Sequence, residues 1–303
     1  MKKNILKYLA LLLISVIIPL GAVVPMQMGE ATNSRWMAEL ADEASLNSLT
    51  LPGTHDSGAI YSIADLSGKC QSLPIREQLK IGVRFFDVRL QLVNNELNVV
   101  HSFVDQMTAF KDVLADMAAF IRDNGSEFLL VSIKEDASPK DSDKSFTAVL
   151  EELLRSYPEV SGERVLPDTV GDARGGIHIL ARYRDASIGL PCHVGWSDDA
   201  TFELDGIYVQ DNYCVADTDE KIADIRSTYS VALEGRHSLV LNYTSCYLET
   251  SFPPIYAGLP AHTINRDTYT ALNEEYGDGA LGVIVCDFIT SELADAIIGR
   301  NFR

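Results

Sequence analysis

The chain has 303 residues, of which 47% are hydrophobic and 22% are charged. Acidic residues outnumber basic ones 43 to 25, which argues against a nucleic-acid-binding protein, because such proteins carry a basic face. Any anionic substrate must therefore be held by a few local cations rather than by general attraction.

The first 31 residues have the composition of a secretory signal peptide. Lys2 and Lys3 precede an almost wholly apolar run from residue 8 to residue 24. The run is also nearly long enough to be a membrane anchor, so that alternative stays open. We expect a secreted protein, or a membrane-tethered one if the leader is retained. Removing the leader takes away three basic residues and one acidic residue, which leaves residues 32–303 with a net charge of −20.

Cysteine usage gives little sign of a disulfide-rich or zinc-bound scaffold. The five cysteines are Cys70, Cys192, Cys214, Cys246 and Cys286. None has the C-x-x-C spacing of a structural zinc site, and the number is too small for a disulfide framework. Because the number is odd, at least one thiol is unpaired. We expect mostly buried thiols, with at most one bridge.

Strand-like and helical patterns alternate along the chain. Apolar runs typical of strands occur at residues 46–51, 82–90, 97–100, 127–134, 177–183, 206–210, 238–243 and 280–288. Helical spacing occurs at residues 110–121, 146–154, 221–233, 265–275 and 291–298. This alternation predicts an α/β fold, a single-domain, irregular (β/α)8-like TIM barrel. The irregularity lies at residues 85–100, where Asn94-Asn95 joins two strands without a helix.

Two motifs near the start of this pattern carry groups suited to phosphate chemistry. His55 and Asp56 stand side by side in the Gly-bordered segment 51–58, although a single histidine there is more often a turn residue. Asp87 and Arg89 are two apart on an apolar strand, so they share one face. Burying such a pair is costly without a partner or an anionic ligand. His101 follows the next strand and completes a set of two imidazoles and one guanidinium.

Other polar residues also stand at the ends of the predicted strands. They are Lys134, Arg182, Asp211 and Asp287. In barrels of this type the reactive groups lie at the carboxyl ends of the strands. The repeated coincidence therefore predicts one site at that end.

Seven short segments in a fixed order resemble bacterial phosphatidylinositol-specific phospholipase C, a secreted form of the phospholipase C X-domain family. They are residues 51–58, 84–89, 131–135, 171–175 with Arg182-Tyr183, 209–213, 242–245 and 285–288. The resemblance runs from about residue 36 to residue 298. It implies a phosphorus–oxygen lyase in which the inositol 2-hydroxyl attacks phosphorus. Diacylglycerol then leaves, and inositol 1,2-cyclic phosphate forms.

The resemblance also implies the catalytic residues. His55 is similar to the family's general base, oriented by Asp287. His101 is similar to the general acid that protonates the leaving glycerol oxygen, with Asp56 in support. Arg89 is similar to the arginine that binds the phosphate oxygens. Two histidines can serve as base and acid near neutral pH.

A second set of residues is similar to the family's substrate binders. Lys134, Arg182 and Asp211 match positions that bind inositol hydroxyls, and Tyr213 matches a tyrosine that stacks on the sugar ring. Asp87 belongs to this set chiefly because it can hold Arg89 in place. For Lys134 a salt bridge with a neighbouring acid is the alternative. For Tyr213 the alternative is simple packing.

We expect a metal-independent enzyme without a cofactor. Calcium-using members of the superfamily are similar, but they have Asn after the first histidine and an acidic cluster where Arg89 stands here. In this chain Asp56 follows His55, and Arg89 puts a positive charge in the place of the ion. Ser102 is a departure, because the family usually has Gly after the second histidine. The family's membrane-facing tryptophans have no match either.

The expected partner is phosphatidylinositol in membranes or micelles, with glycosylphosphatidylinositol anchors as a further substrate class. We expect a monomer that binds no nucleic acid. Two alternatives stay open, a phosphodiesterase for another phospholipid head group and a non-catalytic module that binds inositol lipids. Three polyol binders argue against the first alternative. The two histidines with Arg89 argue against the non-catalytic module, because binding alone needs no proton transfer.

Overall fold

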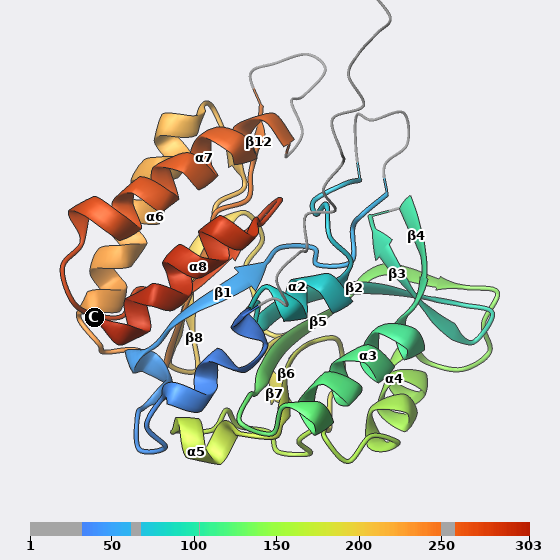
Figure 1. Ribbon diagram of the computed structural model, residues 1–303. Helices are drawn as coiled ribbons and strands as arrows, with labels where there is room; N and C mark the ends of the chain where they lie inside the picture. The colour runs from blue at the N-terminus through green and yellow to red at the C-terminus, as the bar shows by residue number, and fades with distance from the viewer. Residues whose placement is uncertain (1–31, 62–67, 103, 250–257) are drawn as a thin grey trace, which may run out of the picture. The chain divides into compact units, whose positions relative to one another are not determined.

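The computed structural model describes residues 32–61, 68–102, 104–249 and 258–303. Its core is a curled sheet of eight parallel strands (Figure 1). In chain order they are β1 (Thr50–Thr54), β2 (Phe85–Val93), β5 (Leu129–Lys140), β6 (Ile177–Arg182), β7 (Leu190–Pro191), β9 (Ile207–Asp211), β11 (Leu239–Tyr243) and β13 (Gly282–Cys286). Each strand pairs with the next in this order except β7 with β9, and β13 pairs back onto β1.

The predicted barrel is confirmed, and its irregularity has two parts. Strands β2, β3 (Glu96–His101) and β4 (Val104–Ala109) form an antiparallel meander that extends beyond the parallel strands. Asn94 and Asn95 both have positive φ, as the tight turn between β2 and β3 requires. In addition, no pairing of β7 with β9 occurs in the described part of the chain, and the antiparallel β8 (Ala200–Leu204) lies beside β9 instead.

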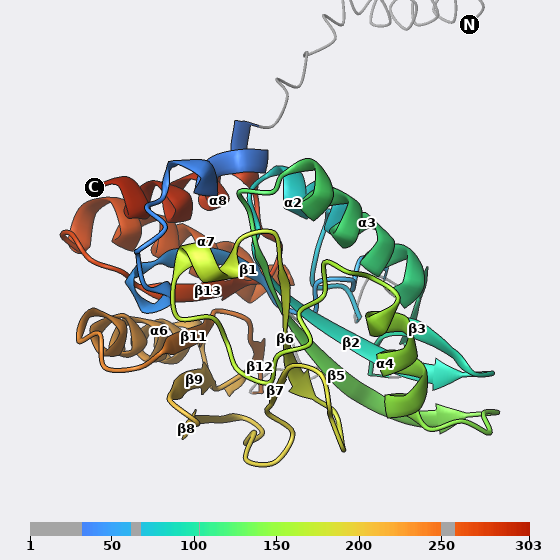
Figure 2. The same ribbon diagram turned by 90° about the horizontal axis from the view of Figure 1, so that it is seen from below.

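Helices cover the outside of the parallel strands. Figure 2 shows α2 (Ile75–Lys80), α3 (Phe110–Asp123) and α4 (Phe146–Arg155) on the side of β2 and β5. The helices α6 (Thr218–Leu233), α7 (Gly258–Thr270) and α8 (Ser291–Gly299) pack on the side of β1 and β11. A short helix, α5 (Val170–Ala173), precedes β6. Five of these helices were predicted, although α7 begins before residue 265 and a π-helical turn (Ala271–Glu275) continues it.

Alternation along the strands separates two apolar layers. Val131 and Ile133 of β5 pack toward the layer that contains the helices, whereas Leu130 belongs to the layer shared with Leu51 and Val283. The second layer therefore fills the inside of the curled sheet. Side chains two residues further along the same strands face this interior as well.

One predicted strand was wrong in its bounds, and another is a strand as predicted but lies in a different part of the sheet. The segment 46–51 is not a single strand, because a 3-10 turn (Leu46–Ser48) precedes β1. Ser48 Oγ donates to the carbonyl oxygen of Ser45 at 2.6 Å, a local bond that competes with strand pairing. The segment 97–100 is a strand of the meander and not one of the eight parallel strands. The missing parallel strand is β7, whose two residues are too few to show a period.

Two further expectations concern disulfides and the membrane. All five cysteines are free thiols and four of them are buried, so the alternative with one bridge does not occur. Within the described residues, no helix has the length and apolar character needed to cross a membrane. The predicted leader lies outside the described residues.

Candidate active site

A cavity of about 450 Å³ opens at the carboxyl ends of the parallel strands. Eight of the ten predicted site residues line it: His55, Arg89, His101, Lys134, Arg182, Asp211, Tyr213 and Asp287. The other two, Asp56 and Asp87, are fully buried beside it. Strand parity explains most of this convergence. Arg89, for example, lies four residues beyond Phe85, which belongs to the interior layer.

Three cations stand side by side across neighbouring strands. Arg89 of β2 is the register partner of Lys134 in β5, and Lys134 is the partner of Arg182 in β6. Because partners in parallel strands are directly adjacent, the three side chains form one row along the cavity wall. Such a row is the local positive charge that an anionic substrate needs in an otherwise acidic protein.

His55 is held in one tautomer by its two neighbours. Its Nδ1 lies 2.8 Å from Asp287 Oδ1, and its Nε2 lies 2.8 Å from Arg89 Nη2. An ionised carboxylate only accepts hydrogen bonds, and a guanidinium only donates them. Nδ1 therefore carries the proton, and Nε2 presents a lone pair. Burial lowers the pKa of His55, but the charge of Asp287, its hydrogen bond to the ring and the charge of Asp56 together outweigh burial, and the pKa is raised.

Gln71 fixes the chain around this histidine. Its Nε2 donates at 2.8 Å to the carbonyl oxygens of both His55 and Cys286. Cys286 precedes Asp287, so one buried amide ties together the two strand ends that carry the dyad. Sequence reasoning missed Gln71, since a glutamine in a segment without periodicity gives no signal of such a role.

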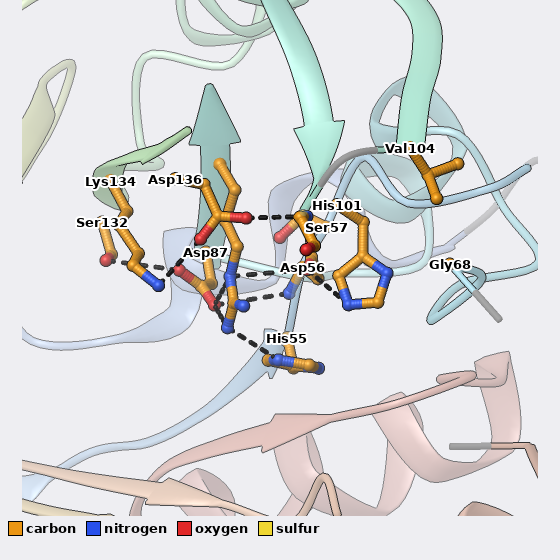
Figure 3. A network of polar contacts seen from close by, with 12 residues as sticks. His55, Asp56, Ser57, Gly68, Asp87, His101, Val104, Ser132, Lys134 and Asp136 are labelled. Carbon is orange, nitrogen blue, oxygen red and sulfur yellow. Dashed lines mark hydrogen bonds and ion pairs between the residues drawn. The ribbon is translucent and has the colours of Figure 1, made fainter. Parts of the chain in front are cut away.

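Arg89 connects the two histidines. Besides its bond to His55, its Nη2 donates to Asp87 Oδ2 at 3.2 Å, and its Nε lies 3.4 Å from Asp56 Oδ2. Asp56 Oδ2 in turn lies 3.5 Å from His101 Nε2. Figure 3 shows both imidazoles in one network with Asp56 and Asp87. Burial lowers the pKa of Arg89, but Asp56 and Asp87 outweigh it and the pKa is raised, so the guanidinium stays charged.

Asp56 occupies a restrained backbone position. Its φ is +43°, a left-handed conformation that Asp tolerates better than most residues. Burial raises the pKa of its carboxyl, while Arg89 and His101 act in the opposite direction. The side chain is held between these two cationic or ionisable groups, which fits the supporting role predicted for it.

Asp87 lies behind the cations rather than in the cavity. It is fully buried, and Arg182 Nη1 approaches its Oδ1 at 3.3 Å while Arg89 binds Oδ2. Burial raises the pKa of this carboxyl, but Arg89 and Arg182 outweigh it and hold the pKa well below its usual range. This placement fits the narrower prediction that Asp87 holds Arg89, and not direct contact with a substrate.

The sequence left two environments open for Lys134, a salt bridge with a neighbouring acid and a place in the binding site, and the structure shows both. Its Nζ forms an ion pair with Asp136 Oδ1 at 2.8 Å, yet its side chain also lines the cavity. The other oxygen of Asp136 accepts the backbone N–H of Ser102 at 2.8 Å. Ser102 has a φ of +54°, so it adopts the conformation that glycine favours at this position. Asp136 thus links the Lys134 strand to the loop that follows His101.

Arg182, Tyr213 and Asp211 are the remaining predicted residues of the cavity. Arg182 stacks on Trp196 with its guanidinium carbon 3.9 Å from the ring centroid, a cation–π contact that no spacing predicted. Tyr213 lines the cavity, and its hydroxyl donates to Asp198 Oδ2 at 3.0 Å. Asp211 is buried at the cavity edge, and burial raises the pKa of its carboxyl. The binding roles of these residues stay predictions.

The chain is similar to known proteins along most of its length. The family model described as phosphatidylinositol-specific phospholipase C, X domain, matches residues 52–178. The 1-phosphatidylinositol phosphodiesterase of Listeria monocytogenes is 24% identical over 280 residues, covering 89% of this chain and 86% of the relative. The protein of the same name from Staphylococcus aureus strain Newman is 29% identical over 205 residues, covering 59% of this chain and 64% of the relative.

Solved structures show the same fold. A mutant of the phosphatidylinositol-specific phospholipase C from Staphylococcus aureus superposes with a TM-score of 0.77 at 22% identity, covering 88% of this chain and 98% of that one. The enzyme from Listeria monocytogenes gives a TM-score of 0.71 at 22% identity with the same coverage. The family match contains His55, Arg89, His101 and Lys134. The chain is therefore similar, over most of its length, to bacterial phosphatidylinositol-specific phospholipase C, and its residues 52–178 match the X domain of that family.

Proposed function

We propose that this protein is a phosphatidylinositol-specific phospholipase C that cleaves its substrate without a metal ion. The observation that carries the proposal is the arrangement around Arg89. A guanidinium lies between two imidazoles in one cavity, that of His55, whose Nε2 lone pair accepts from Arg89, and that of His101. The related proteins of Listeria and Staphylococcus aureus are named for action on phosphatidylinositol.

The first step uses His55 and Arg89. A phosphate oxygen that enters the cavity accepts N–H bonds from Arg89, which frees His55 Nε2 from its present contact with that side chain. Nε2 then takes the proton of the inositol 2-hydroxyl as the oxygen attacks phosphorus, while Asp287 stabilises the imidazolium. The nucleophile belongs to the substrate itself, so positioning supplies much of the rate.

The second half of the reaction uses His101. As the phosphorus–oxygen bond to glycerol breaks, protonated His101 gives its proton to the leaving oxygen, with Asp56 beside its Nε2. Diacylglycerol and inositol 1,2-cyclic phosphate are the products. Arg89 stabilises the negative charge that develops on the phosphate oxygens. A metal ion is not needed for this charge balance.

One assay tests the proposal. The purified protein is incubated with phosphatidylinositol in mixed micelles plus a calcium chelator, and the phosphorus resonances are followed. Cyclic inositol phosphate is the expected product. Turnover only of another diester would instead support a phosphodiesterase for another phospholipid head group. Binding without turnover would support a non-catalytic module that binds inositol lipids. Lys134 and Arg182 beside Arg89 favour the inositol substrate, because a smaller head group does not need so many polar contacts.

Several wider properties belong to the same proposal. The basic and apolar leader supports secretion, which N-terminal sequencing of the protein from culture medium would test. A structural relative from Staphylococcus aureus is described in terms of its membrane binding, and vesicle sedimentation would test that property here. Glycosylphosphatidylinositol anchors are a second substrate class, testable by release of an anchored protein from cells. Light scattering would test the proposed monomer.

A further inference from the structure

The thiol of Cys70 lies close to both histidines and to the carboxylate that accompanies each of them. The Sγ atom of Cys70 forms one compact group with Asp56 and His101, and another with His55 and Asp287. Within each group, one ligand atom from each residue lies within 4.8 Å of the others. Cys70 is buried but lines the cavity. None of the catalytic roles proposed above uses this thiol.

The chemistry of these donors points to a thiophilic cation. Cysteine sulfur, histidine nitrogen and a carboxylate oxygen are the ligands that Zn²⁺ takes in proteins, commonly three of them with one position left open. Calcium and magnesium instead prefer oxygen ligands alone. The presence of a thiol in both groups therefore selects a cation of the zinc type.

Of the two groups, the one with Asp56 has ligand atoms closer to the spacing of a tetrahedral zinc site. In a tetrahedral zinc site, nitrogen and oxygen ligands at about 2.0–2.1 Å from the ion lie about 3.4 Å apart. His101 Nε2 and Asp56 Oδ2 are separated by 3.5 Å. In contrast, His55 Nδ1 and Asp287 Oδ1 form a hydrogen bond at 2.8 Å, which an ion would have to break.

The state of Asp56 also favours a ligand at this place. Its carboxylate is fully buried, and neither oxygen accepts a hydrogen bond from the described residues. A buried carboxylate without hydrogen bonds is costly, and a bound cation removes that cost. Arg89, with Nε 3.4 Å from Asp56 Oδ2, opposes a second positive charge. The negative charge that Cys70 gains on losing its proton offsets this repulsion.

We propose that Asp56, Cys70 and His101 form an inhibitory site for a thiophilic divalent cation such as Zn²⁺. The ion binds the thiolate of Cys70, whose proton goes to solvent, together with one carboxylate oxygen and His101 Nε2. Its fourth position faces the cavity. Because the metal occupies the lone pair of Nε2, His101 cannot carry the proton that it gives to the leaving oxygen. The inhibition rests on the proposed function, whereas the binding of the metal does not.

The binding test uses Co²⁺ as a spectroscopic substitute for zinc. The metal-free protein is titrated with Co²⁺ and then with Zn²⁺, in parallel with Cys70→Thr, Cys70→Ser and the control Cys246→Ser. Cys246 is a second buried thiol of the cavity wall that belongs to neither group. We expect a thiolate-to-cobalt charge-transfer band in the unchanged protein and in Cys246→Ser, lost when Zn²⁺ is added. Both Cys70 variants should lack the band and bind Co²⁺ at least about tenfold more weakly.

The activity test measures each protein against its own metal-free rate. Zn²⁺ should inhibit the unchanged protein and Cys246→Ser, a chelator should restore the rate, and both Cys70 variants should resist inhibition. A band that persists in a folded Cys70 variant, or no band in the unchanged protein, would overturn the site. If the metal-free protein does not cleave phosphatidylinositol, the proposed function fails, and the cobalt titration still decides the metal site separately.

Discussion

Arg84, which directly precedes β2, and Arg89, within β2, have opposite surroundings. Arg84, just before β2, is fully buried and makes an ion pair with Glu127 at 2.7 Å. Its other donors bind the carbonyl oxygens of Leu79, Val83, Asn33 and Ser34. Arg89, five residues later, keeps 15% of its side chain exposed to the cavity, and several of its contacts are 3.2 Å or longer.

The difference separates a structural cation from one that we propose binds a ligand. Arg84 has a partner for every N–H direction and stacks 4.7 Å from the centre of the Phe120 ring, so nothing remains for a ligand. Arg89 is held in place by acids but retains an open face toward the cavity. In barrels of this type, residues at the amino ends of the strands serve stability and those at the carboxyl ends serve chemistry. The two arginines follow that division.

The largest effect that we expect is a loss of catalytic rate when a side chain of the cavity is removed. His55→Ala removes the proposed base and should lower kcat about 10²–10⁴-fold, while the thermal unfolding temperature stays nearly unchanged. Initial rates on phosphatidylinositol and circular dichroism measure the two quantities. The matched control is His193→Ala, an exposed histidine that should keep the full rate. A His55 variant that stays folded and active would remove the assigned base.

Arg84→Met tests the structural side. Loss of the cation leaves Glu127 buried without its partner, so the free energy of unfolding should fall by about 3–5 kcal/mol. Urea denaturation followed by tryptophan fluorescence measures this loss. The double variant Arg84→Met with Glu127→Leu should recover part of the stability. The rate per folded molecule should change little, and a large fall in that rate would contradict the division between the two arginines.

Arg89→Lys sharpens the comparison, because it keeps the charge and removes the planar fork of donors. We expect kcat to fall about 10²-fold and the free energy of unfolding to change by less than about 1 kcal/mol. Steady-state kinetics and urea denaturation on the same preparation provide both values. An unchanged rate would mean that a point charge is enough, and that bidentate contact with the phosphate is not part of the mechanism.

Asp287→Asn should give the smallest effect of the series, a shift in pH dependence. Asp287 raises the pKa of His55, so its neutralisation should lower that pKa. The base must be unprotonated, and the acid limb of the kcat/KM profile should therefore move to lower pH, with a reduced maximum. Asp116→Asn, a change at an exposed acid on α3, should leave the limb in place. If the acid limb does not move in Asp287→Asn, the carboxylate of Asp287 is not the group that raises the pKa of His55.

The sequence predicted the parts of the molecule that have a long pattern or a motif. The apolar runs of β2, β5 and β13 are continuous because both faces are covered, so they were visible. Strand parity then placed Asp87 and Arg89 on one face. The two-residue β7 has no period to detect, and the segment at Leu46 was mistaken for strand because local serine bonds form a turn instead.

Contacts between distant segments could not be predicted in the same way. Gln71 on the His55 and Cys286 carbonyls, and Trp196 under Arg182, join residues that have no regular spacing. The thiol of Cys70 was expected to be buried, but its place between both acid–base pairs depends on the path of a loop. Only the folded chain shows which segments such loops bring together.

A substrate with a more acidic leaving group tests the central claim most directly. If His101 is the acid and His55 the base, an aryl leaving group that departs as a stable phenolate needs no proton from His101. His101→Ala should then recover most of its rate on an inositol aryl phosphodiester relative to phosphatidylinositol, while His55→Ala stays slow on both. Equal losses for the two variants on both substrates would contradict the assignment of acid and base.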